Sequence, residues 1–416
     1  MKKYFLLLIS ILFITACSKT PNDCDIYEVD DINQVKICGV FSLTENMTDL
    51  GIDSKAAMEL AVDDFKAMLV RNSINYTVDY VIEDSKLNPD IAKEIVEARF
   101  KEGYRIFIGP SSSSEISKIK PFYESNDVLV ISHYSTAGSL AADDNLFRYS
   151  PPDRLESLAM SKYIVKQGKK AIVTLYRNDV GNKGLYDALK TYFTAEGGKM
   201  YNPVSFEPTT TDYAQTIINL RNTLIQALDE NPTEQVIVYY AGFSECKQIL
   251  ELASQDEVFS TVQWYCGDGI TLNNAIFESQ KASDFAKKVS LISPTVGLDF
   301  SANAIYTPLI ARILAKTGKT TVNNYALGVY DATWNALTAK LSVRANKFSQ
   351  LKNQFVTNSN TYFGASGFTK LDNFGDRQFS TFDFWYITGE PAKWDNSASY
   401  NILKDSWEFT SHDGVK

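Results

Sequence analysis

The sequence predicts an α/β protein with two successive parallel sheets. Short runs rich in β-branched and aromatic residues alternate with segments of helical periodicity along most of the 416 residues. Strand–helix–strand repetition of this kind aligns strands in parallel and covers both faces of the sheet with helices. The pattern restarts after Ser150-Pro151-Pro152-Asp153, which marks a boundary between two sheets. A length of this order also fits two or three domains.

The first half contains four predicted strands, at residues 35–43, 76–83, 104–108 and 128–132. Apolar side chains between them recur three and four residues apart, as at Ala57, Ala61 and Phe65, which is typical of a helix covering a sheet. Gly109-Pro110 and four serines follow the third strand, and a helix is predicted over about 113–124. These segments therefore predict alternating strands and helices.

The second half repeats the alternation. Its predicted helices cover residues 154–167, 184–196, 213–228 and 245–254, and its predicted strands cover 171–176, 201–206, 236–240 and 261–266. A third segment adds a strand at 289–293, helices around 306–315 and 325–341, and a final strand at 379–387.

The first residues indicate export. Lys2 and Lys3 precede an apolar run at 4–14, which is too short to span a bilayer comfortably, and small residues precede Cys17. This order resembles the bacterial lipobox, so residues 1–16 are predicted to be a lipoprotein signal peptide and Cys17 the lipidated mature N-terminus. An ordinary signal peptide with an incidental cysteine is the alternative. Residues 17–33 are predicted to form a polar tether.

The charge balance excludes several classes of protein. Removal of residues 1–16 loses two lysines, which leaves 39 basic against 50 acidic residues and a formal charge of −11. Nucleic-acid binding needs a basic surface, as does electrostatic binding to a membrane. We therefore expect no nucleic-acid partner and attachment to a membrane through the lipid only.

Cysteine and histidine usage bounds the chemistry. Export permits disulfides, and two local pairs, Cys24–Cys38 and Cys246–Cys266, are plausible among the three possible pairings. The chain has only two histidines, and neither metal-ligand spacing nor a nucleophile, phosphate-loop or dinucleotide motif occurs. We expect no catalytic residues, no metal and no cofactor.

Several short motifs follow one another along the chain: GVFSLT at 39–44, IGP at 108–110, FRYSP at 147–151, YDA at 330–332 and GF at 367–368. Each motif alone is weak. Their order resembles the type I periplasmic solute-binding proteins of the branched-chain amino acid ABC transporters. The resemblance covers nearly the whole mature chain.

This resemblance implies two Rossmann-like lobes joined by three crossings. Lobe 1 would comprise 34–149 and 295–360, and lobe 2 would comprise 150–294 and 361–416. The implied function is capture of an amino acid or related solute by cleft closure, on the outer side of a membrane, and delivery to an ABC transporter permease. The alternative is a regulatory or sensor lipoprotein of the same fold that binds a protein partner, such as a cell-wall synthase.

Ligands of open α/β sheets bind beyond the carboxyl ends of the strands. Ser113 follows the strand at 104–108 and opens a helix, whose N-terminus suits a carboxylate. It matches the family's carboxylate-binding serine, although serines also simply cap helices. Thr136 follows the strand at 128–132 and matches the threonine that contacts both charged groups of the ligand.

The remaining predicted site residues carry one open alternative each. Tyr134, next to Ser135, would either reach the ligand or lie in an exposed loop. Asp268 matches the acid that pairs with the ligand's ammonium, although Asp-Gly is also an ordinary turn. Phe243 and Leu50 match lining positions of lobe 2 and lobe 1.

One position departs from the family. Gly181 stands where members often carry an aromatic residue, which weakens an assignment to leucine, isoleucine or valine and leaves room for a larger or different ligand.

Overall fold

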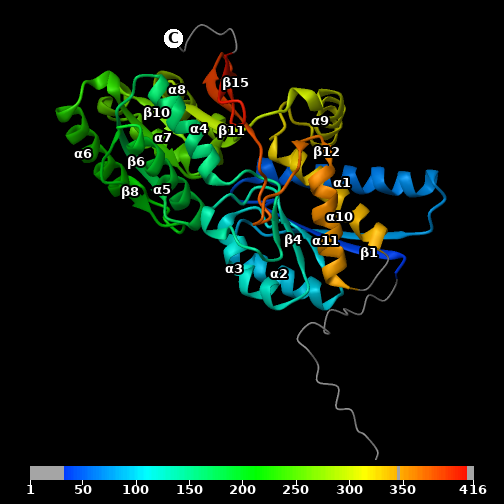
Figure 1. Cartoon of the computed structure of the whole chain (residues 1–416). Coiled ribbons are helices and arrows are strands. Elements are labelled where there is room, and N and C mark those ends of the chain that lie inside the picture. The colour runs from blue at the N-terminus through cyan, green and yellow to red at the C-terminus, as the bar shows by residue number, and fades with distance from the viewer. Residues whose placement is uncertain (1–31, 344–346, 410–416) are drawn as a thin grey trace, which may run out of the picture.

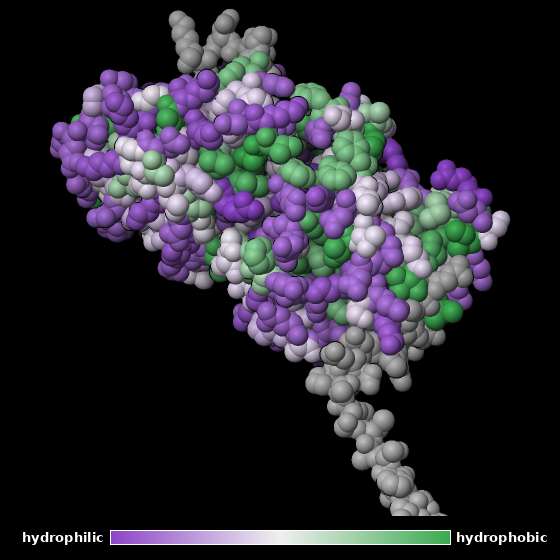
Figure 2. All heavy atoms as spheres, in the orientation of Figure 1, coloured by the Kyte–Doolittle hydropathy of each residue, from purple (hydrophilic) through white to green (hydrophobic). Residues whose placement is uncertain are grey.

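The computed structural model describes residues 32–343 and 347–409, which form two α/β halves lying side by side (Figure 1). The predicted signal peptide, Cys17, Cys24 and nearly all of the predicted tether lie outside the described residues. On the face that Figure 2 shows, hydrophilic side chains cover most of the surface. None of the described helices has the length and apolar character needed to cross a membrane.

The first sheet has five parallel strands within the described residues, in the order β2-β1-β3-β4-β5. The strands are β1 (Gln34–Phe41), β2 (Thr77–Asp84), β3 (Ile106–Ile108), β4 (Leu129–Ser132) and β5 (Leu146–Arg148), and the helices between them are α1 (Thr48–Arg71), α2 (Pro89–Lys101) and α3 (Ser113–Ser125). Alternate residues of β1 enter two different cores, Ile37 on one face and Cys38 on the other. Helices therefore cover both faces, as the alternation predicts.

The second sheet continues the parallel pattern and then changes direction. Its parallel strands are β6 (Ala171–Arg177), β7 (Lys199–Met200), β8 (Val204–Phe206), β9 (Val236–Ala241), β10 (Gln263–Cys266) and β11 (Ile292–Val296). The helices are α4 (Asp153–Lys166), α5 (Val180–Ala195), α6 (Ala214–Glu230), α7 (Cys246–Ala253) and α8 (Gln280–Lys288). Three antiparallel strands, β14 (Thr381–Thr388), β15 (Lys393–Asn401) and β16 (Ser406–Phe409), extend the sheet from β11.

The third segment returns to the first half before the final strands. Helices α9 (Asn303–Thr317) and α10 (Tyr325–Val343) pack on α1, and α11 (Phe348–Thr361) packs on α10. The short strands β12 (Phe363–Gly364) and β13 (Gly367–Phe368) then lead back to β14. The chain thus passes between the halves after β5, after β11 and before β14, consistent with a two-lobed α/β fold.

The exact lobe boundaries remain a prediction. Strand β11 ends at Val296, two residues beyond the predicted boundary at 294. Residues 362–380 lie beyond the predicted boundary at 360, and two of them, Ser366 and Asp376, bond to Asp331 and Arg148 of the first half.

The local differences from the sequence predictions have clear causes. Only the second half of the strand predicted at 201–206 is a strand, β8; β7 ends before this range, and Pro203 between them has no N–H to donate to a sheet. A 3-10 helix, η3 (Glu257–Thr261), precedes β10 and shortens the strand predicted from 261. The sequence analysis did not predict α11, β15 or β16.

The predicted Cys246–Cys266 disulfide is absent from the structure. Both residues carry free thiols in the same apolar core, where they are 1% exposed. Burial raises the pKa of both thiols, and the side chains pack as small apolar groups. Cys38 is a free, buried thiol as well.

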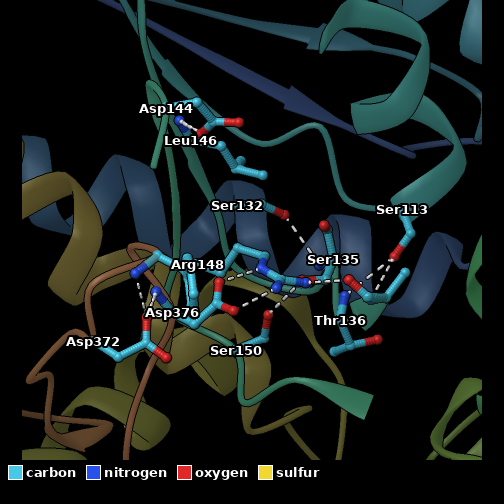
Figure 3. A network of polar contacts seen from close by, with 12 residues as sticks. Ser113, Ser132, Ser135, Thr136, Asp144, Leu146, Arg148, Ser150, Asp372 and Asp376 are labelled. Carbon is cyan, nitrogen blue, oxygen red and sulfur yellow. Dashed lines mark hydrogen bonds and ion pairs between the residues drawn. The ribbon is translucent and has the colours of Figure 1, made fainter. Parts of the chain in front are cut away.

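A buried ion pair holds the segment before β14 against the first sheet (Figure 3). Arg148, the last residue of β5, donates from Nε to Asp376 Oδ1 and from Nη2 to Oδ2, both at 2.6 Å. Both side chains are at most 4% exposed. The N–H groups of Arg148 and Arg377 add backbone bonds across the same contact. One planar guanidinium therefore fixes two distant parts of the chain to each other.

Removal of the Arg148 charge should lower the free energy of unfolding of the protein. Arg148→Met leaves the Asp376 carboxylate buried without its partner, so we expect a loss of about 3–5 kcal/mol in the free energy of unfolding. Urea titration followed by circular dichroism measures it. Lys93→Met breaks the exposed pair with Glu97 and should cost about 0.3–0.5 kcal/mol. Similar losses in both variants would show that the buried pair has no special role.

Candidate functional site

A cavity lies between the halves, beyond the carboxyl ends of strands from both sheets. It holds about 620 Å³ of space, part of it open to solvent. The first half contributes residues 112–114, Tyr134 and Thr136, and the second half contributes Asp153, Phe243 and Asp268 among others. The loops after β3, β4, β9 and β10 therefore meet at one place, as expected for open parallel sheets.

The structure brings together most of the predicted site residues. Five of them line the cavity: Ser113, Tyr134, Thr136, Phe243 and Asp268. Two do not. Ser135 lies beneath the cavity, fully buried, with its carbonyl accepting from the Ser150 hydroxyl. Leu50 belongs to the first turn of α1, where its side chain packs in the apolar core and is 3% exposed. Neither residue is placed to contact a ligand.

The Ser113 hydroxyl is held in position by the loop after β4. Its oxygen accepts from the N–H groups of Thr136 and Ala137, both at 3.1 Å (Figure 3). With both lone pairs so used, the hydroxyl hydrogen is left to donate to a ligand. This geometry favours a carboxylate or another acceptor beside Ser113.

Ser112, not Ser113, caps the helix α3. Its hydroxyl accepts from the Glu115 N–H, and the Glu115 carboxylate accepts from the Ser112 N–H, which is a complete capping box. The alternative that Ser113 only caps the helix is therefore not what the structure shows. The N–H groups of the first helical turn, at Ser113 and Ser114, have no partner within the helix because of their position.

Tyr134 is buried at the cavity wall. It is 6% exposed and packs edge-to-face on Tyr325, the first residue of α10, with 4.7 Å between ring centroids. The exposed-loop alternative is therefore wrong. Burial and the nearby Asp268 carboxylate raise the pKa of the Tyr134 hydroxyl, so it stays protonated.

Asp268 connects the two halves. It begins the 3-10 turn η4 (Asp268–Ile270) after β10, so it does occupy a turn, and its carboxylate also faces the cavity. The Tyr325 hydroxyl donates to Oδ2 at 2.9 Å. Burial raises the pKa of Asp268, and the hydroxyls of Tyr325 and Tyr134 oppose that rise.

Two more carboxyl groups lie at this site, and neither is predicted from the sequence. Asp153 opens α4 and lines the cavity, and Glu156 accepts from the Asp268 N–H at 3.1 Å. Burial is the main cause that raises the pKa of both, to about 7 for Asp153. A spacing of three residues puts both on one helix face, which the sequence could have indicated. The segment Pro151-Pro152-Asp153 by itself indicates only a boundary between the two sheets.

Another wall of the cavity carries one guanidinium beside two carboxylates. Arg177 lies 2.9 Å from Asp179 and 3.6 Å from Glu245, and its guanidinium lies over the Phe243 ring. A Cβ atom at Gly181 would be 3.7 Å from the Ser113 hydroxyl. This glycine therefore keeps open the part of the cavity into which an aromatic side chain would extend.

The geometry agrees with the comparisons to known proteins. The chain matches the family described as "Periplasmic binding protein" over residues 34–368 and therefore belongs to it. An uncharacterised protein of Methanocaldococcus jannaschii, MJ1266, is 24% identical over 414 residues, which cover 94% of this chain and 97% of that protein.

Solved structures confirm the type I periplasmic binding fold. The leucine-binding protein LivK of Thermotoga maritima superposes with a TM-score of 0.71 at 20% identity, covering 89% of this chain and 99% of that one. LivJ of Streptococcus pneumoniae, in complex with isoleucine, gives 0.66 at 16% identity over 87% and 99%. A solute-binding protein of R. palustris, in complex with benzoate, gives 0.70 at 16% identity over 87% and 95%. At these identities the likeness establishes the fold.

The raised pKa of Asp153 makes stability depend on pH in a defined direction. The folded pKa is about 7 and the unfolded pKa about 3.9, so between these values the folded state holds a proton that the unfolded state has lost. The free energy of unfolding contributed by this group therefore falls as pH rises from about 4 to about 7.

Asp153→Asn should remove that fall. Relative to wild type, the variant should gain about 2–4 kcal/mol of stability between pH 4 and pH 7.5, measured by urea unfolding of the ligand-free protein. Asp229→Asn, an exposed carboxylate of α6, is the matched control. A constant difference between wild type and Asp153→Asn across this pH range would contradict the assignment.

Proposed function

We propose that this protein is an extracytoplasmic receptor that captures an amino acid or related small molecule in the cavity between its lobes and delivers it to an ABC transporter. One observation carries the proposal. The hydroxyl of Ser113 and the N-terminus of α3 lie on one side of a single cavity, and the carboxylate of Asp268 lies on the other. This is the arrangement of donors and an acceptor that a zwitterion needs. The family and the names of its structural neighbours support the same function.

In the proposed mechanism, the ligand carboxylate binds first to the lobe that holds Ser113 and the free N–H groups of α3. Its ammonium group then meets Asp268 from the other lobe. The charge pair forms fully only when the lobes close, so the ligand stabilises the closed form by its greater affinity for that form. A micromolar ligand supplies about 8 kcal/mol for this purpose.

Several contacts join the two halves, as expected if the lobes close around a ligand. The Asn274 N–H, which follows β10, donates to Asp49 Oδ2 of α1 at 3.0 Å. The Lys319 ammonium holds the same aspartate in place at 3.3 Å. Together with the bond from Tyr325 to Asp268, these contacts join the two halves to each other.

The location follows from the proposed N-terminal processing. Cleavage before Cys17 and lipidation of its thiol would anchor the protein to a membrane of the cell envelope, on the outer side of the cytoplasmic membrane. Residues 17–33 would separate the lobes from the lipid surface. The permease would then meet a receptor tethered close to it.

Asp268→Ala should weaken ligand binding by about thirtyfold or more, because the ligand's ammonium loses a buried partner worth about 2–5 kcal/mol. The ligand is first found as the amino acid of a broad panel that raises the melting temperature. Isothermal titration calorimetry then compares the variant with wild type. The exposed Asp229→Asn should bind as wild type does. Unchanged affinity in Asp268→Ala removes this residue from the site, and a panel without any shift favours the regulatory alternative.

Cys17→Ser should abolish the lipid anchor. In cells that express the protein, mass spectrometry of the wild type should find a mature N-terminus at Cys17 with acyl chains, and the protein should sediment with membranes. The variant should lack the acyl mass and leave the membrane fraction. A wild-type protein that carries no lipid on Cys17 would reduce the N-terminal segment to an ordinary signal peptide.

A further inference from the structure

The cavity contains more carboxyl groups than a zwitterion needs. Asp153 and Asp268 line it, and Glu156 lies directly behind Asp268, to whose N–H it is bonded. Among the described residues, none of these three carboxyl groups makes an ion pair. Two guanidiniums of this region already have carboxylate partners: Arg177 pairs with Asp179, and Arg148, whose charge lowers the pKa of Asp153, pairs with Asp376. Without such a partner these carboxyls take up protons more readily, because burial raises their pKa values, and a cationic group on the ligand is the partner that would hold Asp153 ionised.

Asp153 carries a second, independent sign of a missing partner. Its side chain is 3% exposed, it lines the cavity, and Oδ2 has no hydrogen-bond partner in the described part of the chain. Buried polar atoms in native proteins nearly always have a partner. Gly184 of α5 packs next to this oxygen, where a Cβ would lie 3.1 Å from Oδ2, so a larger residue at this position would crowd the carboxylate.

A neutral amino acid would leave this part of the cavity unmatched. Its carboxylate meets the Ser113 hydroxyl and the N–H groups of α3, and its single ammonium meets Asp268, so it adds no net charge. The wall between these polar groups is apolar and includes Leu185, Pro208 and Phe243. An aliphatic stem would cover such a wall and carry a charged end beyond it, as lysine side chains do on protein surfaces.

We infer that the ligand is an α-amino acid with a second cationic group, an ammonium or guanidinium, and that Asp153 is the residue that receives that group. The inference rests on the proposed function, because it assumes that the α-ammonium occupies Asp268. It adds the substrate class, a basic rather than an aliphatic amino acid, and names a residue that determines specificity.

The test compares L-lysine with L-norleucine, which has the same carbon chain and lacks only the terminal ammonium. Titration calorimetry on the full chain in detergent should give an affinity for lysine at least about tenfold higher than for norleucine, as expected for a hydrogen bond to a charged group. Asp153→Asn should reduce the affinity for lysine by about tenfold or more and that for norleucine by less than about threefold. Asp229→Asn should change neither.

Three results would overturn the inference and leave the proposed function in place. The first is equal binding of lysine and norleucine to wild type, or tighter binding of norleucine. The second is an equal loss of both in Asp153→Asn, which would assign Asp153 to the α-ammonium. The third is tight binding of putrescine, which has two ammonium groups and no carboxylate. Binding of Ca²⁺ that excludes all amino acids, or no binding of any amino acid, would end both. The lysine–norleucine comparison on wild type does not depend on the folding of any variant.

Discussion

The buried guanidinium of Arg148 connects the hinge of the molecule to its cavity. It binds Asp376 in the segment before β14, and its Nη1 donates to the carbonyl of Ala137 at 2.7 Å. The adjacent N–H groups of this loop donate to Ser113, so the hydroxyl offered to the ligand depends on the same guanidinium. Figure 3 shows Arg148, Asp376 and Ser113 within this one network of polar contacts. A cation that cannot lose its charge thus fixes both the chain crossing and one wall of the site.

The opposite wall of the cavity depends on buried carboxyl groups. Asp268, Asp153 and Glu156 are largely removed from water and make no ion pair with a described residue, although the charge of Arg148 acts on Asp153, and such burial is costly for the folded state. A site that is complementary only with its ligand present commonly stores such a cost. The first lobe therefore offers a fixed hydroxyl and the N–H groups of a helix start, and the second lobe offers buried carboxyl groups, of which Asp153 has one oxygen without a hydrogen-bond partner among the described residues.

The sequence predicted the parallel sheets well because strands buried on both faces read as continuous apolar runs, such as Ile106–Ile108. It did not predict β15, whose residues Lys393–Asn401 are mostly polar and only partly buried, although the strand pairs with both β14 and β16. Strand ends located Ser113, Thr136 and Asp268. A sequence cannot show which side chain of a loop or helix points inward, which is why Leu50 and Ser135 were named and Asp153 was not.

The Tyr325 hydroxyl would compete with a ligand for the Asp268 carboxylate. Its hydroxyl already occupies Asp268 Oδ2, although it comes from α10, which packs on the other half. A solute that binds Asp268 would gain only the difference in free energy between its own hydrogen bond to this carboxylate and the bond that the Tyr325 hydroxyl already makes. Neutral solutes with hydroxyl or amide donors therefore have no advantage over the protein itself, whereas an ammonium does. In the proposed receptor, such an arrangement would favour solutes with an ammonium group over neutral ones.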